Sequence, residues 1–387
     1  MNIGFDGKRI FQNKTGLGNY GRTLVTILAQ LFPQNRYILF APKQTGLFMT
    51  GVISDAEVHV PKSLFYKAFP VLWRRHGMIK DIAIAGLNIY HGLSNELPRG
   101  IEIAKIKTVV TVHDLIFERF PETYHFDERF VHRWKVKRAC KIADAIIAIS
   151  KQTKDDLVNL YGINAEKIFI CYQSCNPVFE KKTTEVEKEL VRKKYQLPDK
   201  YFLFVSSITS RKNLFTICKA MILLKDELAV PLVVIGDGKK EKEKVKQLMK
   251  LNGIEERLIL LNELPSSKES SFTSGSDFPA IYQQALALVY PSIFEGFGLP
   301  VLEALWSGLP VICSNTSSLP EVAGDAALYF SPYDCKLLAK HMADIATNTI
   351  LVETLSRRGF EQAGKFATGK YADSIVEVYK GVMVGDG

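Results

Sequence analysis

One stretch, Leu288–Cys313, constrains the fold of this chain more than any other. Its sequence, LVYPSIFEGFGLPVLEALWSGLPVIC, contains an apolar run, a glycine-rich loop, a helical segment and a second apolar run. Pro291 ends the first run, and Gly296 and Gly298 free the loop backbone. Pro300 suits the first turn of a helix, because that position needs no N–H donor. The stretch therefore predicts a buried strand, a loop, a helix and another buried strand.

The start of the predicted helix is a candidate anion site. The amides of Gly298, Leu299 and Val301 lie at the positive end of the helix, where they can bind an anion. Glu295 lies in the loop before them, and Glu303 lies one turn into the helix, where side chains lean back toward the N-terminus. Carboxylates accept hydrogen bonds from hydroxyl groups. The combination favours a ligand with phosphates and hydroxyls, such as a nucleotide sugar.

The pattern E-G-F-G-L-P-x-x-E-A resembles the retaining glycosyltransferases of family GT4. The resemblance implies a GT-B fold, in which two Rossmann-like α/β domains have parallel sheets facing across a cleft. It also implies that a nucleoside diphosphate sugar is the donor. By the same resemblance, the donor-binding residues of the second domain are Leu261, Glu295, Gly296, Phe297, Gly298, Leu299 and Glu303.

Length and composition agree with a two-domain α/β protein. A chain of 387 residues is long enough for two domains. The opening MNIGFDGKRI lacks the apolar core of a signal peptide, and no apolar run reaches the roughly 18 residues of a membrane span. The six cysteines form no zinc-binding pattern, so we expect reduced thiols and a cytoplasmic location.

Strand and helix patterns alternate on both sides of a charged connector, which predicts parallel sheets with right-handed crossovers. We expect an acceptor-side domain at 1–175, a linker at 176–200 and a nucleotide-sugar domain at 201–370. The resemblance implies that a last helix, 371–387, crosses back to the first domain. The Ser-rich insertion at 266–278 is expected to be a mobile surface loop, with a lid as the alternative.

The net positive charge of the chain lies in the first predicted domain. Residues 1–175 hold 24 lysines and arginines against 15 acidic residues, whereas residues 176–387 hold 26 of each. The segment Lys62–Lys80 interleaves aromatic and aliphatic residues with cations. It is either an ordinary helical region with a basic face or a peripheral contact with an anionic membrane, at the inner face of the plasma membrane, and the charge excess favours the contact. No nucleic-acid recognition motif accompanies the basic helix at 130–141, so no nucleic-acid partner is expected.

A glycine pattern follows the first predicted strand. The segment KTGLGNYGRTL places Gly16, Gly18 and Gly21 in G-x-G-x-x-G spacing. No acid follows the second strand to bind a ribose, so the pattern does not indicate NAD. We expect a loop whose backbone lies near phosphates, with a plain glycine turn as the alternative. GT4 enzymes have a similar G-x-G-x-Y loop facing the donor, and Gly16, Gly18 and Tyr20 match it.

His113 stands at the end of a predicted buried strand, where ligands bind in open α/β sheets. A single histidine is often only structural. The stretch HDLIFERFPETYHF resembles one GT4 subgroup, and in those relatives a histidine here lies beside the donor sugar. The resemblance makes His113 the candidate for contacting the transferred sugar, with its imidazole or its backbone carbonyl.

Arg211 and Lys212 follow the first strand of the second domain and open a helix. Two cations at this position suit a diphosphate leaving group, whose negative charge grows as the glycosidic bond breaks. Lys212 matches the family lysine. Ser206 and Ser207 replace the usual opening of this loop, and Arg211 is a candidate to compensate.

The resemblance implies sugar transfer to a hydroxyl with retention of anomeric configuration. HDLIFERFPETY most resembles mannosyltransferases that build bacterial surface polysaccharides on lipid carriers. GDP-mannose is therefore the first candidate donor, and a glycan or lipid-linked molecule is the expected acceptor. UDP-glucose, UDP-N-acetylglucosamine and deoxysugar nucleotides stay open.

No Asp-x-Asp motif for a metal occurs in the sequence, so we expect no metal or other cofactor, and activity that survives EDTA. Two alternatives to transfer remain. One is a GT-B epimerase or phosphorylase. The other is a non-catalytic protein that binds a nucleotide sugar or a polyanion.

Overall fold

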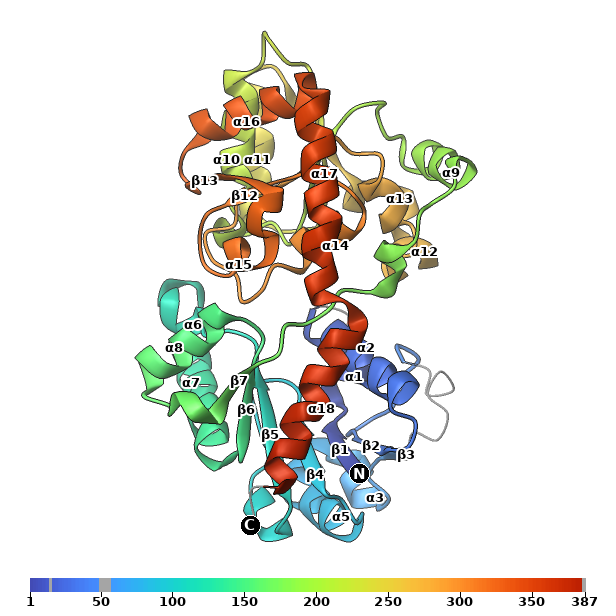
Figure 1. The fold of residues 1–387 in the computed structure, drawn as a ribbon, viewed down its shortest axis with the longest axis vertical. Coiled ribbons are helices and arrows are strands. Elements are labelled where there is room, and N and C mark those ends of the chain that lie inside the picture. Colours follow the sequence, from blue (N-terminus) through green and yellow to red (C-terminus); the bar gives the residue numbers. More distant parts are fainter. Residues whose placement is uncertain (14–15, 49–56, 385–387) are drawn as a thin grey trace. The chain divides into compact units, whose positions relative to one another are not determined.

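The computed structural model describes residues 1–13, 16–48 and 57–384. The chain divides into a first unit, Met1–Gln173 with Ala367–Gly387, and a second unit, Ser174–Phe366. Each unit contains one sheet whose described strands all run parallel, with helices packed on both faces (Figure 1). The prediction of two Rossmann-like α/β units is confirmed.

The sheet of the first unit has the order β3-β2-β1-β4-β5-β6-β7, so its strand order reverses between β1 and β4. The strands are β1 (Asn2–Asp6), β2 (Arg36–Phe40), β3 (Glu57–His59), β4 (Ile89–Gly92), β5 (Lys107–Val112), β6 (Ala145–Ala148) and β7 (Ile168–Ile170). The α-helices are α1 (Lys8–Gln12), α2 (Gly16–Leu31), α3 (Leu64–Ala68), α4 (Pro70–Leu72), α5 (Met78–Ile84), α6 (Ile116–Arg119), α7 (Phe126–Ile142), α8 (Lys151–Tyr161) and α18 (Thr368–Val384). A π-helical turn, Trp73–Gly77, joins α4 to α5.

The core of the first unit lies on both faces of this sheet. On one face, α5 and α7 bury Ile82 and Val136 against Tyr90 and Val110. On the other face, α18 packs beside α2 and over β5 (Figure 1). The last helix of the chain is thus part of the first unit.

The sheet of the second unit has the order β10-β9-β8-β11-β12-β13. The strands are β8 (Phe202–Val205), β9 (Leu232–Ile235), β10 (Leu258–Leu260), β11 (Ala287–Tyr290), β12 (Val311–Ser314) and β13 (Ala327–Phe330). The helices are α9 (Glu185–Tyr195), α10 (Leu214–Leu223), α11 (Lys240–Leu251), α12 (Ser270–Ser274), α13 (Phe278–Tyr282), α14 (Leu299–Trp306), α15 (Leu319–Ala323), α16 (Cys335–Thr347) and α17 (Thr349–Ala363). Helices α10, α11 and α16 bury their apolar faces against β8, β9 and β12.

Two segments are more ordered than the sequence suggests. The predicted linker 176–200 contains α9, which begins with a capping box at Thr184 and packs on α13. The predicted mobile loop 266–278 contains α12, whose Phe272 is buried and lies 5.6 Å from the ring of Tyr195. Phe272, together with hydrogen bonds from Lys194 and Tyr195 to Ser271 and Asp277, holds the serine-rich stretch against α9. The segment 176–200 belongs to the second unit.

The glycine pattern near the N-terminus is helical rather than a loop. Gly16, Gly18 and Gly21 lie in α2, whereas Lys14 and Thr15 of the predicted loop are outside the described residues. A Cβ at Gly18 would lie 1.9 Å from the carbonyl oxygen of Asn13. Gly18 therefore permits a close approach of α2 to the end of α1, a packing role that the pattern by itself did not indicate.

No described helix is long and apolar enough to cross a membrane. All six cysteines are free thiols, and only Cys335 among them is not fully buried.

Candidate functional site

The second unit has a topological switch point between β8 and β11. Strand order runs outward in opposite directions from this pair, so the connections leave the sheet on opposite faces. The strand ends at such a point are where open α/β sheets bind ligands. The loop after β8 carries Arg211 and Lys212, and the loop after β11 carries Glu295. Both loops lie at the carboxyl edge of the sheet. The residues that the sequence analysis assigned to a diphosphate and a sugar therefore meet at one place.

Lys212 and Glu295 form a buried ion pair at these strand ends. The Lys212 ammonium donates to Oε1 of Glu295 and, at 3.0 Å, to the hydroxyl of Tyr290. The Tyr290 hydroxyl in turn donates to Glu295 Oε1 at 3.0 Å. Arg211 Nη1 lies 3.4 Å from Glu295 Oε2 and donates to the carbonyl of Phe294. One carboxylate is thus held by two cations and a phenol.

The two cations keep Glu295 ionised. Burial raises the pKa of the Glu295 carboxyl, but the charges of Lys212 and Arg211 outweigh burial and hold the pKa below its ordinary value. Glu295 is therefore a fixed anion, an acceptor for hydroxyl groups. The site as a whole carries one more positive than negative charge, which suits an added phosphate.

The loop that carries Glu295 is held by hydroxyl groups of the β12–α15 connection. The backbone amide of Glu295 donates to Ser317 Oγ at 2.9 Å, and Ser318 Oγ donates to the carbonyl of Phe297 at 2.7 Å. On the β8 side, the Asn213 amide group donates to the carbonyls of Pro291 and Pro332, at 3.1 and 2.7 Å. These bonds tie together four loops, those after β8, β11, β12 and β13, at the strand ends.

Gly298 opens helix α14 in a conformation that only glycine adopts easily. Its φ is +112°, and a Cβ there would lie 2.8 Å from Leu319. The amide of Val301 donates to the Gly298 carbonyl at 2.9 Å, so it is engaged within the helix. The expectation that Val301 offers an amide to an anion was wrong, because the first turn closes on itself. Gly298 and Leu299 remain the candidate donors.

Glu303 lies on α14 and is separate from the Glu295 cluster. Its Oε2 accepts a hydrogen bond of 2.8 Å from the hydroxyl of Tyr282. Burial without a cation at hand raises the pKa of the Glu303 carboxyl to about 7, although the Tyr282 hydrogen bond acts in the opposite direction. The two glutamates of the motif therefore differ in charge near neutral pH.

This difference predicts a pH effect on stability. A carboxyl whose pKa is raised on folding contributes stability that is complete below its unfolded pKa and is lost as the pH rises through its folded pKa. We expect that contribution to be complete below about pH 4.5 and lost through pH 7, at most about 3 kcal/mol. Between pH 5 and 8, the Tm of wild type should fall more than the Tm of Glu303→Gln, measured by thermal unfolding. Glu353→Gln, at an exposed position, should follow wild type. Parallel wild-type and Glu303→Gln profiles would contradict the prediction.

His113 lies in the first unit, directly after β5, and is buried. Its Nε2 lies 2.8 Å from the carbonyl of Leu93, and because a carbonyl only accepts, Nε2 carries the proton. Burial lowers the pKa of the imidazole to about 4, so His113 is neutral and presents Nδ1 as an acceptor. The carbonyl of His113 accepts a hydrogen bond of 3.0 Å from Thr153. The imidazole is therefore better placed than the carbonyl to meet a ligand.

A buried polar chain that the sequence analysis missed supports His113. Tyr20 of α2 packs edge-on against the His113 ring with centroids 4.5 Å apart, and its hydroxyl lies 3.0 Å from Thr111 Oγ1. Thr111 Oγ1 is 2.8 Å from Nε2 of His91, and Nδ1 of His91 is 2.7 Å from the hydroxyl of Tyr379 on α18. The alternation of apolar and polar residues in TVVTVHD is the signal that could have placed Thr111 and His113 on one face.

The remaining predicted residues lie at the ends of their elements. Leu261 is fully buried in the turn after β10, next to Asn262, whose side chain accepts from the Gly236 amide at 2.6 Å. Gly16 begins α2 with open space around its α-carbon. Within the described residues, no cluster of three or more His, Cys, Asp or Glu could hold a metal ion.

Comparison with known proteins shows the family. The family described as Glycosyltransferase Family 4 matches residues 16–177, and the one described as Glycosyl transferases group 1 matches residues 187–362. The O-antigen chain mannosyltransferase B of Escherichia coli is 31% identical over 296 residues, 76% of this chain and 74% of that protein. The chain belongs to glycosyltransferase family 4.

Solved glycosyltransferase structures have the same fold. A glycosyltransferase from Rickettsia africae superposes with a TM-score of 0.76 at 17% identity, covering 100% of this chain and 99% of that one. HepE from Anabaena, solved with UDP and glucose, superposes with a TM-score of 0.76 at 16% identity, covering 98% of this chain and 100% of that one. The fold of this family 4 member is GT-B. The enzyme is a hexosyltransferase with a nucleotide-sugar donor and a glycan acceptor, and the epimerase, phosphorylase and binding-protein alternatives are not favoured.

Proposed function

We propose that this enzyme transfers mannose from GDP-mannose to a hydroxyl of a glycan or lipid-linked acceptor during surface polysaccharide synthesis. The observation that carries the proposal is the meeting of Lys212, Arg211 and Glu295 at the switch point of the second unit. The choice of mannose is supported by the similarity to an O-antigen mannosyltransferase. The reaction would take place in the cytoplasm, at the inner face of the plasma membrane.

In this proposal the second unit binds the donor. Lys212 and Arg211 stabilise the diphosphate, and the amides of Gly298 and Leu299 add the positive end of α14. Glu295 accepts hydrogen bonds from hydroxyls of the sugar. Glu303 accepts from the ribose. The other donor contacts come from the backbone of Gly296 and Phe297, from Leu261 beside the base, and from the glycines at the start of α2, Gly16 and Gly18.

The chemical step follows from this arrangement. The bond between the anomeric carbon and the diphosphate oxygen breaks, and a bond from the acceptor oxygen forms on the same face, which retains the configuration. The acceptor proton passes to the departing phosphate oxygen. Negative charge grows on the diphosphate as the bond breaks, and Lys212 and Arg211 are already in place to stabilise it. His113, neutral and with Nδ1 as an acceptor, holds a sugar hydroxyl.

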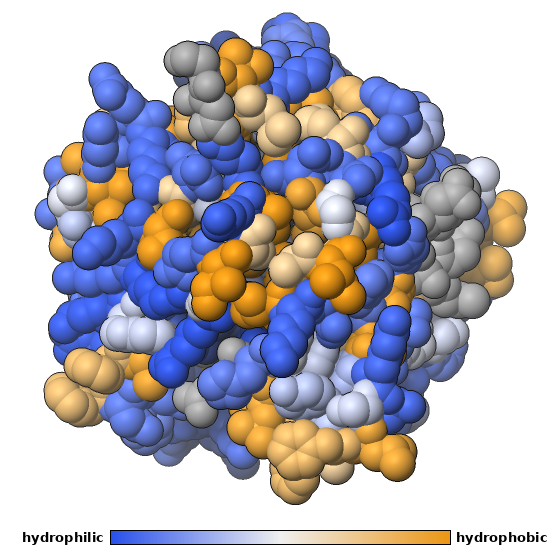
Figure 2. Space-filling view, turned by 90° about the horizontal axis from the view of Figure 1, so that it is seen from below, coloured by the Kyte–Doolittle hydropathy of each residue, from blue (hydrophilic) through white to orange (hydrophobic). Residues whose placement is uncertain are grey.

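A peripheral membrane contact is the second part of the proposal. Around α3 and α4, Leu64, Phe65, Phe69 and Val71 are between 53% and 84% exposed. Lys62 and Lys67 lie beside them in sequence. Groups of apolar side chains among hydrophilic ones are visible on one face of the molecule (Figure 2). Exposed apolar groups flanked by lysines suit the surface of an anionic bilayer.

The donor assignment is tested with a thermal-shift panel of GDP-mannose, UDP-glucose and UDP-N-acetylglucosamine. A bound donor stabilises the folded state by mass action, by about 2.7 kcal/mol at a hundred times its Kd. We expect the largest rise in Tm with GDP-mannose, and release of GDP when an acceptor glycan is added. A larger shift with a UDP sugar would overturn the choice of GDP-mannose. No shift with any nucleotide sugar would overturn the proposed site.

A further inference from the structure

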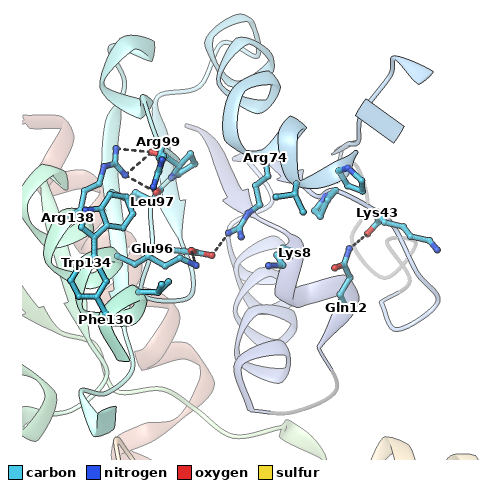
Figure 3. A pocket seen from close by; sticks show the side chains of 16 residues that line it. Lys8, Gln12, Lys43, Arg74, Glu96, Leu97, Arg99, Phe130, Trp134 and Arg138 are labelled. Carbon is cyan, nitrogen blue, oxygen red and sulfur yellow. Dashed lines mark hydrogen bonds and ion pairs between the residues drawn. The ribbon is translucent and has the colours of Figure 1, made fainter. Parts of the chain in front are cut away.

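A large groove in the first unit is not used by the donor chemistry. Its volume is about 970 Å³, and all of its lining residues belong to the first unit. One wall is α7, the other is α4 with the turn that follows it, and the floor is formed by the segments after β1 and β4 (Figure 3). The lining combines two kinds of side chain, cationic and apolar, and a single acid.

The cations of the groove are in clear excess. Six line it, namely Lys8, Lys43, Arg74, Arg99, Lys135 and Arg138, against one carboxylate, Glu96. Arg74 pairs with Glu96 across the floor (Figure 3). Arg74 also pairs with Asp6, and Lys135 lies 2.8 Å from Glu96. The floor is therefore a structural ion-pair network, and its charges are already balanced.

Three of the six cations have no carboxylate partner among the residues that the structure describes: Lys8, Lys43 and Arg99. Arg99 instead lies over the ring of Trp134, 4.6 Å from its centroid. Burial and the nearby charge of Arg74 lower the pKa of Lys8, the response expected of a lysine in a positive environment. These three side chains are available to an anion.

The apolar part of the groove is exposed in the same place. On α7, Phe130, Val131 and Trp134 are 61%, 48% and 41% exposed, and Val71 on the opposite wall is 71% exposed. A ligand that covers exposed apolar surface of this kind is stabilised in proportion to the apolar area removed from water. A fully hydrophilic anion, such as a nucleotide phosphate or a nucleic acid backbone, would leave these walls in water.

We propose that this groove binds the phosphate-bearing end of an anionic lipid: its cations hold the phosphates and its walls cover the first apolar units of the chain. The proposal rests on the proposed function, because it makes the acceptor a glycan on a lipid phosphate or diphosphate. A groove of this size suits one lipid chain that enters between α4 and α7. A flat bilayer would contact only the rim of the groove. The exposed residues of α3 and α4 at that rim would then face the bilayer from which the lipid comes.

Binding measurements with three ligands test the contributions of the diphosphate and of the apolar chain separately. Farnesyl diphosphate, inorganic pyrophosphate and farnesol are titrated into the full-length enzyme, with tryptophan fluorescence as the readout because Trp134 lines the groove. We expect farnesyl diphosphate to bind at least about tenfold more tightly than either of the other two. Equal affinity for pyrophosphate would overturn the proposal, since the apolar walls would then contribute nothing. Binding to phosphatidylglycerol vesicles without binding to farnesyl diphosphate would also overturn it, in favour of a plain membrane contact.

Charge reversal tests the assignment to this groove. The double variant Lys43→Glu/Arg99→Glu changes two exposed side chains that have no carboxylate partner in the described part of the chain, so folding should be kept. We expect the Kd for farnesyl diphosphate, measured by calorimetry, to rise at least about tenfold, and the KM for a lipid-linked acceptor to rise with it. Lys200→Glu, an exposed position of the second unit, is the control and should leave both unchanged.

The thermal shift with GDP-mannose distinguishes the two proposals. If the groove inference is right, the double variant keeps the wild-type shift while losing lipid affinity. If the double variant keeps its lipid affinity, the groove inference is wrong and the proposed function stands. If wild type shows no shift with any nucleotide sugar but still binds farnesyl diphosphate through this groove, it is the donor assignment that fails.

Discussion

Replacement of Lys212 by alanine is expected to lower kcat for sugar transfer by about 10²–10³-fold. The Lys212 ammonium lies between the Glu295 carboxylate and the Tyr290 hydroxyl, at the strand ends where the diphosphate is proposed to depart. Its charge would stabilise the leaving group in the transition state more than in the ground state, so the loss should appear in kcat rather than in KM. Steady-state rates at saturating GDP-mannose measure it.

Controls separate this effect from a loss of folding. Removing one partner of a buried pair is destabilising by roughly 3–5 kcal/mol. The Tm of each variant is therefore measured, and rates are compared only at temperatures where the variant is folded. Lys225→Ala, at an exposed position of the same unit, should leave kcat unchanged. Because Lys212 and Glu295 act as a pair, the double alanine variant should lose less than the product of the two single losses. A folded Lys212→Ala enzyme with a rate within threefold of wild type would contradict the assigned role.

Replacement of Gly236 by alanine is expected to lower the stability of the second unit by at least about 3 kcal/mol. Gly236 directly follows β9 with φ +149°, and an added Cβ would lie 1.8 Å from the carbonyl oxygen of Ser206. The added Cβ is fixed by the Gly236 backbone, and the Ser206 oxygen is itself backbone at the carboxyl edge of the sheet, so relief of the clash requires the backbone to move. The Tm should fall by roughly 6–12 °C. Thermal unfolding followed by circular dichroism checks it.

A glycine without these constraints provides the control. Nothing lies within 4 Å of a Cβ built at Gly364, and its φ is −57°. Gly364→Ala should change stability by no more than about 1 kcal/mol, with a gain the expected direction, since alanine restricts the unfolded chain. Similar Tm values for Gly236→Ala and Gly364→Ala would contradict the prediction. They would show that the backbone after β9 can move to accept a Cβ at little cost.

Much of the second unit could be predicted because its signals are local. The strand, loop, helix and strand predicted for Leu288–Cys313 correspond to β11, the loop after it, α14 and β12. The glycine at 298 and the proline at 300 open α14 as expected. These features depend on the backbone preferences of single residues and on runs of apolar residues. Both can be read from residues that are neighbours in the sequence.

Three features that the sequence did not reveal share one physical cause, which is contact between distant segments. Gly18 of α2 permits close packing, which depends on where α1 and Asn13 lie. The serine-rich insertion is ordered by Phe272 against Tyr195, and the segment predicted as a linker is ordered by α9 packing on α13. Residue propensity and motif spacing describe single segments. They therefore do not reveal contacts with residues that lie far away in the sequence.

The sequence by itself determined the class of this protein: alternating strands and helices require parallel sheets, and the E-x7-E stretch with its glycines carries the family resemblance. Only the tertiary structure decided the charge states of the site. Lys212 and Arg211 come within reach of Glu295 because β8 and β11 are neighbours in the sheet, and no such cation reaches Glu303. Two glutamates eight residues apart thus acquire opposite pKa shifts, since charge interaction depends on distance and burial in space, not on position along the chain.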